Sequence, residues 1–169
     1  MDDSFLAAVE RNRHLLAIVL LAFFLYQGVN LINMWSPTGE ERLTVGTGLI
    51  HFKRGICNGP NPPLLQTLLA APYAFGLDQF EIFTNSPPNT ARYVNLLLSL
   101  FCGVALYLLC ERKIGGLSGV FALLLYCFSP NVLTHSALAT IDMGSGLLAL
   151  LFIFAFERSW QNNSPKGEP

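Results

Sequence analysis

Long apolar runs alternate with polar segments along this chain. The first run covers residues 15–35. At 1.5 Å per residue it reaches roughly 32 Å, which is enough to cross the hydrocarbon core of a bilayer. Three later runs predict further spans at 92–110, 117–135 and 140–156, and Ser129-Pro130-Asn131 interrupts the third of these. The pattern predicts an all-α polytopic membrane protein with about four transmembrane helices.

The segment between the first two spans, residues 36–91, contains no run long enough to cross a membrane. "GLIHFKRG", residues 48–55, is consistent with the end of an amphipathic helix that begins near Glu41. The apolar stretch 64–71 is enclosed by prolines and is too short to span, which indicates an interfacial or re-entrant helix. We therefore expect short juxtamembrane helices within a long first extracytoplasmic loop.

Composition supports a membrane protein and excludes several other classes. Hydrophobic residues make up 52% of the chain and charged residues 12%, whereas soluble domains carry about 25% charged residues. The net charge of −1 gives no electrostatic footprint for nucleic acid, so no such partner is expected. The four cysteines form no CxxC pair, and no metal site is predicted from spacing. A requirement for a divalent metal stays open.

The distribution of Lys and Arg predicts the orientation of the spans. The first run is too long for a cleaved signal peptide, so we interpret it as an uncleaved anchor. With the N-terminus inside, the basic residues inside are Arg11, Arg13, Arg112, Lys113, Arg158 and Lys166, and those outside are Arg42, Lys53, Arg54 and Arg92. The richer inside set predicts a cytoplasmic lead at 1–14 and a cytoplasmic tail at 157–169. The membrane would be a plasma or inner membrane, or the endoplasmic reticulum in a eukaryote.

Ionisable residues gather on the expected outer side. Asp142 lies at the start of the fourth apolar run, where a charge is costly and tends to face a polar cavity or a partner. It is equally suited to cap the helix, and the two roles are compatible. Glu40 and Glu41 follow the first span. They are either first-turn acids favoured by the helix dipole or candidates for a general base.

The order of these motifs resembles a known family. An acid pair at Glu40-Glu41 is followed by "NGPNPPLLQTLLAAP", then by Ala91-Arg92 at the second span and by "SPNVLTHSALATID" before the fourth. This order resembles the N-terminal third of polytopic GT-C-type glycosyltransferases, in particular protein O-mannosyltransferase and aminoarabinose transferase relatives. The resemblance covers about residues 15–156, which we treat as one membrane domain.

The resemblance implies a catalytic role for the acid pair. Glu40 matches the family's catalytic Asp, and Glu41 matches the Glu that follows it. The first carboxylate would deprotonate an acceptor hydroxyl, and a dolichyl- or undecaprenyl-phosphate sugar would be the donor substrate. No separate cofactor is implied. Arg92, with Lys53 or Arg54, would steady the phosphate of the donor as charge develops on it.

Other positions of the resemblance imply a substrate-binding cavity. His135 and Asp142 would complete it, and Asn61 stands where the family has His or Lys. The departures are neutral residues: Pro60 replaces the family's Glu, and Ala137 replaces its Arg. Glu40 itself replaces an Asp.

The chain has fewer spans than members of this family, so we expect a truncated or partial form of such an enzyme. Two alternatives stay open: a non-catalytic membrane subunit that keeps this region as a scaffold, and a small transporter or channel component with a polar outer vestibule. Polar groups on or near the spans would prefer protein or water to lipid. We therefore expect association with itself or with another membrane chain. These groups are Gln66, Asn95, Ser99 and Asp142.

Overall fold

The computed structural model describes residues 10–36, 38–56, 61–76 and 89–163. These residues form helices and connecting turns without any strand. The helices are α2 (Arg13–Met34), α3 (Gly39–Arg54), α4 (Pro63–Ala74), α5 (Asn89–Lys113), α6 (Gly116–Phe128), α7 (Pro130–Ser136) and α8 (Asp142–Asn163). Within this described part, three helices are long and apolar enough to cross a membrane, or up to four if the bent pair of α6 and α7 is one span. The prediction of an all-α polytopic membrane protein is confirmed.

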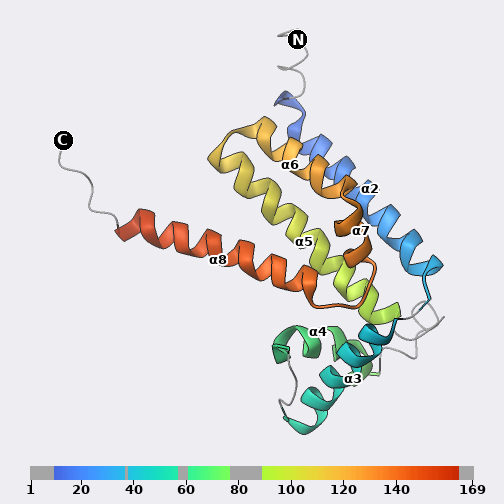
Figure 1. Cartoon of the computed structure of the whole chain (residues 1–169). Coiled ribbons are helices and arrows are strands. Elements are labelled where there is room, and N and C mark those ends of the chain that lie inside the picture. Colours follow the sequence, from blue (N-terminus) through green and yellow to red (C-terminus); the bar gives the residue numbers. More distant parts are fainter. Residues whose placement is uncertain (1–9, 37, 57–60, 77–88, 164–169) are drawn as a thin grey trace.

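The helix α5 lies at the centre of the molecule (Figure 1). It contacts α2 and α6 along its length, and α4, α7 and α8 also pack against it. The core between α2, α5 and α6 includes Phe24, Leu96, Leu123 and Tyr126, all of them buried. At Gly28 a Cβ atom would lie only 2.4 Å from a methyl group of Leu96, so the absence of a side chain there lets α2 approach α5 closely.

The third predicted span is two helices rather than one. Leu117–Phe128 and Pro130–Ser136 meet at an angle of 67°. Pro130 lacks an N–H and forces the preceding residue out of the helical region, and Ser129 accordingly has an extended backbone with ψ of 119°. The break turns α7 toward the end of the bundle at which α5 begins (Figure 1).

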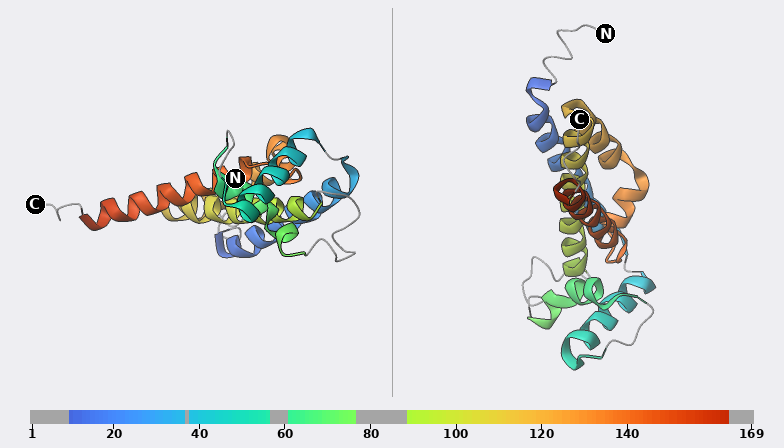
Figure 2. Two further views of the ribbon diagram at one scale, coloured as in Figure 1. Left: turned by 90° about the horizontal axis from the view of Figure 1, so that it is seen from below. Right: turned by 90° about the vertical axis from the view of Figure 1, so that its left-hand side faces the viewer.

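The helices α3 and α4 form a separate pair beyond this same end of the bundle (Figures 1 and 2). A second hydrophobic cluster joins them to α5 and to the turn between α7 and α8. Its buried members are Val45, Leu69, Ala70, Ala91 and Ala139. The first loop is therefore packed onto the bundle through its own small core.

Candidate functional site: a buried ion pair beneath an exposed carboxylate

The acid pair lies in the first turn of α3, and its local geometry is fixed by Thr38. The Thr38 hydroxyl accepts a hydrogen bond from the Glu41 backbone N–H at 3.3 Å. In return the Glu41 carboxylate accepts one from the Thr38 backbone N–H at 2.8 Å. This is a capping box, in which two helix-terminal donors are satisfied reciprocally. It points the Glu41 side chain back toward the start of the helix.

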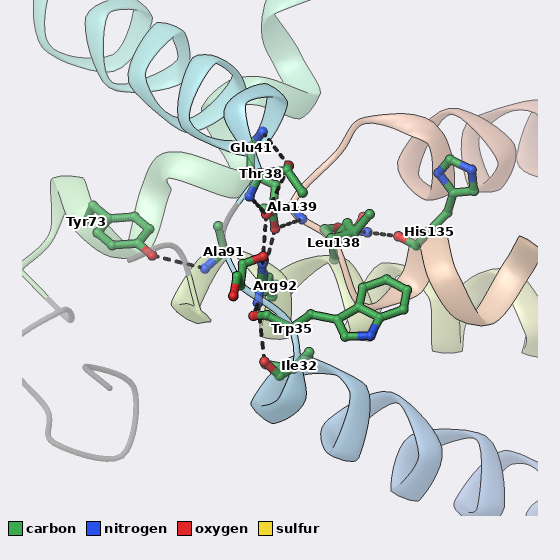
Figure 3. Close-up of polar contacts among 12 residues, drawn as sticks. Ile32, Trp35, Thr38, Glu41, Tyr73, Ala91, Arg92, His135, Leu138 and Ala139 are labelled. Carbon is green, nitrogen blue, oxygen red and sulfur yellow. Dashed lines mark hydrogen bonds and ion pairs between the residues drawn. The ribbon is translucent and has the colours of Figure 1, made fainter. Parts of the chain in front are cut away.

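The carboxylate of Glu41 meets the guanidinium of Arg92, which comes from the first turn of α5 (Figure 3). The Arg92 Nε donates to Glu41 Oε1 at 2.6 Å, and Nη2 donates to Oε2 at 2.8 Å. Both side chains are fully buried. The pair has the forked, two-bond geometry that makes Arg–carboxylate contacts both strong and directional.

The remaining donors of Arg92 hold the end of α2. Nη1 donates to the carbonyls of Ile32 and Trp35 at 3.2 and 2.7 Å, and Nη2 donates to that of Ser36 at 3.0 Å. The last carbonyls of a helix lack partners within the helix, so this guanidinium satisfies them. A guanidinium has five N–H donors, and here each makes a bond inside the protein. In this arrangement Arg92 has no N–H left for a donor phosphate, which differs from the role that the sequence suggested.

The turn between α7 and α8 is bound to the same pair. The Ala139 backbone N–H donates to Glu41 Oε1 at 2.8 Å (Figure 3). Two carbonyls of α7 and the turn, those of His135 and Leu138, accept from the side-chain amide of Asn95 at 2.7 and 2.6 Å. The Glu41–Arg92 pair thus connects four segments: the end of α2, the start of α3, the start of α5 and the α7–α8 turn.

These contacts set the ionisation of Glu41. Burial by itself raises the pKa of a carboxyl group. The hydrogen bonds from Arg92, Ala139 and Thr38 outweigh burial and leave the pKa of Glu41 below its ordinary value. A carboxylate with a lowered pKa and both oxygens engaged is a weak base. Glu41 is therefore suited to hold the site together, whereas the adjacent Glu40 is exposed on the first turn of α3.

Two other predicted site residues are brought together at this end of the molecule. His135 of α7 and Asp142, the first residue of α8, lie 3.0 Å apart through Nδ1 and Oδ2. Their side chains are about half exposed, at 47% and 53%. Both flank the turn that contains Ala139.

The remaining predicted residues lie apart from the acid pair. Lys53 and Arg54 are exposed at the far end of α3, about 20 Å along the helix axis from Glu40 at 1.5 Å per residue. Asn61 precedes α4 and is partly buried. Pro60 lies outside the described residues. Among the described residues, no group of three or more His, Cys, Asp or Glu side chains is placed to hold a metal ion.

The polar groups on the spans find partners only in part. Ser99 donates to the Asn95 carbonyl at 2.8 Å, and Asp142 is paired with His135. The amide oxygens of Gln66 and Asn95 are buried without a hydrogen-bond partner in the described part of the chain. Association through these groups stays a prediction.

Sequence reasoning missed Thr38, although Thr38-Gly39-Glu40-Glu41 fits the capping-box signature of Ser or Thr followed three residues later by Glu. It also missed the Glu41–Arg92 pair and the Ala139 N–H. Those contacts join positions up to 98 residues apart, and no local signature marks them.

Comparison with known proteins identifies the family. Residues 63–167, more than half of the chain, match the family model described as dolichyl-phosphate-mannose-protein mannosyltransferase. The matched range includes Arg92, His135 and Asp142, and it begins after Glu40 and Glu41. No curated protein and no solved structure matches the chain. On the strength of this match, the chain belongs to the dolichyl-phosphate-mannose-protein mannosyltransferase family.

Proposed function

We propose that this chain acts in the transfer of a glycosyl group from a polyprenyl-phosphate sugar to an acceptor hydroxyl at the extracytoplasmic membrane face. The observation that carries the proposal is the different environment of the two adjacent acids. Glu41 is buried and held by Arg92, while the neighbouring Glu40 is exposed at the end of the bundle. The family match supports a lipid-linked sugar as the donor.

In the proposed reaction Glu40 is the general base. Its carboxylate takes the proton of the acceptor hydroxyl, and the oxygen of that hydroxyl forms a bond to the anomeric carbon of the sugar. The bond between that carbon and the phosphate oxygen breaks, and the polyprenyl phosphate leaves with the bonding electrons. An exposed carboxylate can take up a proton from a substrate, whereas one whose lone pairs are all engaged cannot.

Glu41 and Arg92 act as positioning residues in this proposal. Their bonds fix the first turn of α3 against the ends of α2 and α5 and against the α7–α8 turn. Small displacements of a catalytic group lower a rate strongly, so rigid support of the base contributes to catalysis. The half-exposed His135 and Asp142 stand at the same end, and we assign them to the binding of the sugar or the acceptor.

Sugar transfer by membranes that contain the chain tests the proposal. With a polyprenyl-phosphate sugar labelled in the sugar, Glu40→Gln should abolish transfer, since the amide cannot take a proton. The matched control is Arg42→Gln, another exposed first-loop residue on α3, which should keep wild-type transfer. Full activity of the folded Glu40→Gln variant would remove Glu40 from the role of base.

A non-catalytic membrane subunit is the second candidate, and one observation favours it. By the resemblance, Ala137 stands at the position of the family's Arg, and it is fully buried directly after α7. The chain therefore presents no positive charge to a substrate at that position. The wild-type chain would then show no transfer under the conditions above, and Glu40→Gln would behave like the wild type in binding its membrane partner.

A further inference from the structure

The helix α8 leaves the bundle as it runs from the site (Figure 1). Only 11% of its membrane-spanning window is buried, compared with 39% for α5. The divergence of α8 from α5 leaves an apolar groove of about 650 Å³ between them, here called the α5–α8 groove. Its α5 wall runs from Phe101 to Arg112, and its α8 wall runs from Leu147 to Arg158.

The α5–α8 groove is apolar along its length and basic at one end. Leu108, Leu151 and Phe154 are among its lining residues, and its charged lining residues are Arg112 and Arg158. The Arg112 guanidinium lies 5.4 Å from the centre of the Phe154 ring, which holds it at the mouth of the groove. Neither arginine is ion-paired within the part of the chain that the structure describes.

The opposite side of α8 provides a comparison within the same molecule. A second apolar groove there is lined by Lys113 and Glu157 among other residues. These two side chains form an ion pair, so that groove is neutral at its mouth. Of these two grooves, only the one that contains Arg112 and Arg158 presents positive charge without a carboxylate partner in the described part of the chain.

The dimensions of the α5–α8 groove match one leaflet of a bilayer. Each wall advances eleven residues, from 101 to 112 and from 147 to 158, which is about 16 Å at 1.5 Å per residue. Half of a hydrocarbon core is about 15 Å. A chain lying in the groove would extend from the bilayer centre to the interface, where the two guanidinium groups are placed. A smaller pocket of about 330 Å³ lies at this mouth, lined by Arg112, Lys113, Phe154, Glu157 and Arg158. Glu157 is paired there with Lys113, so the two arginines supply the net positive charge of this pocket.

We propose that the α5–α8 groove binds an anionic phospholipid, with an acyl chain along Leu108 and Leu151 and the phosphate at Arg112 and Arg158. Basic pockets between transmembrane helices are typical sites for anionic headgroups. The site lies at the end of α5 opposite the Glu41–Arg92 pair, so it is distinct from the site of sugar transfer. It does not depend on the proposed function.

Native mass spectrometry of the purified chain in detergent micelles tests this proposal. The added lipids are phosphatidylglycerol and phosphatidylcholine with the same acyl chains. We expect retention of phosphatidylglycerol in preference to phosphatidylcholine. Each single variant, R112Q or R158Q, should lower that retention by about fivefold. The double variant R112Q/R158Q should lower it by about 30-fold.

Two further variants distinguish binding in the groove from a general attraction of the lipid to positive charge. Ala155→Trp fills the wall of the groove without changing charge and should also lower retention. Arg42→Gln removes an exposed arginine of α3 and should leave retention unchanged. Equal binding of both lipids overturns the proposal, as does unchanged retention by the folded R112Q/R158Q variant. A dimer that occupies the groove and excludes lipid would also overturn it.

Discussion

Replacing Glu41 by Gln exchanges one carboxylate oxygen at the centre of the site for an NH2 group and keeps the size of the side chain. In the wild type, Oε1 accepts from Arg92 and Ala139, and Oε2 accepts from Arg92 and from both the N–H and the hydroxyl of Thr38. An amide has one accepting oxygen, so its NH2 group would face donors at whichever of the two positions it occupies. Arg92 would also keep its charge without a compensating carboxylate.

The expected loss of stability follows from burial. Both partners are fully buried, and removing one member of a buried ion pair costs about 3–5 kcal/mol because the other charge stays buried alone. This corresponds to a change in the unfolding equilibrium constant of roughly 100-fold to several thousand-fold. The exposed Glu40 provides the matched control, since surface substitutions change stability by about 0.5 kcal/mol or less.

Reversible unfolding of the purified chain in mixed micelles measures this difference. With Trp160 replaced by Phe in every variant, the fluorescence of Trp35 is a suitable signal, because Trp35 lies beside the pair and its carbonyl accepts from Arg92. We expect Glu41→Gln to lower the free energy of unfolding by about 3–5 kcal/mol and Glu40→Gln to leave it nearly unchanged. The reasoning is refuted if the two variants unfold alike. Adding Arg92→Gln to Glu41→Gln should give less than the sum of the single losses, since the two residues are in direct contact.

Three further predictions concern the pH dependence of stability, the packing of α3 and the orientation in the membrane. The lowered pKa of Glu41 means that its pair stabilises the fold above the ordinary value of 4.5 and that this stabilisation is lost as pH falls through the lower pKa of the folded state. The stability of the wild type should therefore decline in acid, and Glu41→Gln should lack that component of the decline in pH-dependent unfolding. A Cβ at Gly48 would lie 2.1 Å from the Gln66 carbonyl oxygen, so Gly48→Ala should destabilise the chain by about 1–3 kcal/mol in the same assay. Gly46→Ala, which meets nothing within 4 Å, should be neutral or stabilising by up to about 1 kcal/mol. Lys53→Cys, in a chain whose four natural cysteines are replaced, should react with an impermeant thiol reagent outside intact cells; labelling only after permeabilisation would reverse the predicted orientation.

Hydropathy predicted the long apolar helices because a membrane span requires a minimum length of apolar residues. The expected range 15–35 corresponds to Arg13–Met34, and 92–110 corresponds to the middle of Asn89–Lys113. The polar residues at the two ends of α5, Asn89-Thr90 and 111–113, lie outside the expected range. At the first end, Asn89 and Thr90 are buried by the packing of the bundle, which hydropathy does not report. Pro130 predicted the position of the bend after α6. Its angle of 67° depends on how α7 packs.

The sequence singled out Glu41 and Arg92, which the structure brings together, but it did not show their contact. The family resemblance implied Arg92 as a phosphate ligand and both Glu40 and Glu41 as catalytic. What separates them is tertiary: three backbone carbonyls and one carboxylate converge on Arg92, and a backbone N–H of a distant turn reaches Glu41. Such convergence depends on the packing of four segments and leaves no trace in local spacing.

The central claim is that Glu40 serves as the base while the neighbouring pair only positions it. Azide attacks an anomeric carbon without losing a proton, so it needs no base. The most direct measurement supplies azide and the labelled donor to membranes that contain the Glu40→Ala variant. The account predicts no transfer to the hydroxyl acceptor but formation of a glycosyl azide. Transfer to the hydroxyl at the wild-type rate by the folded variant would contradict it.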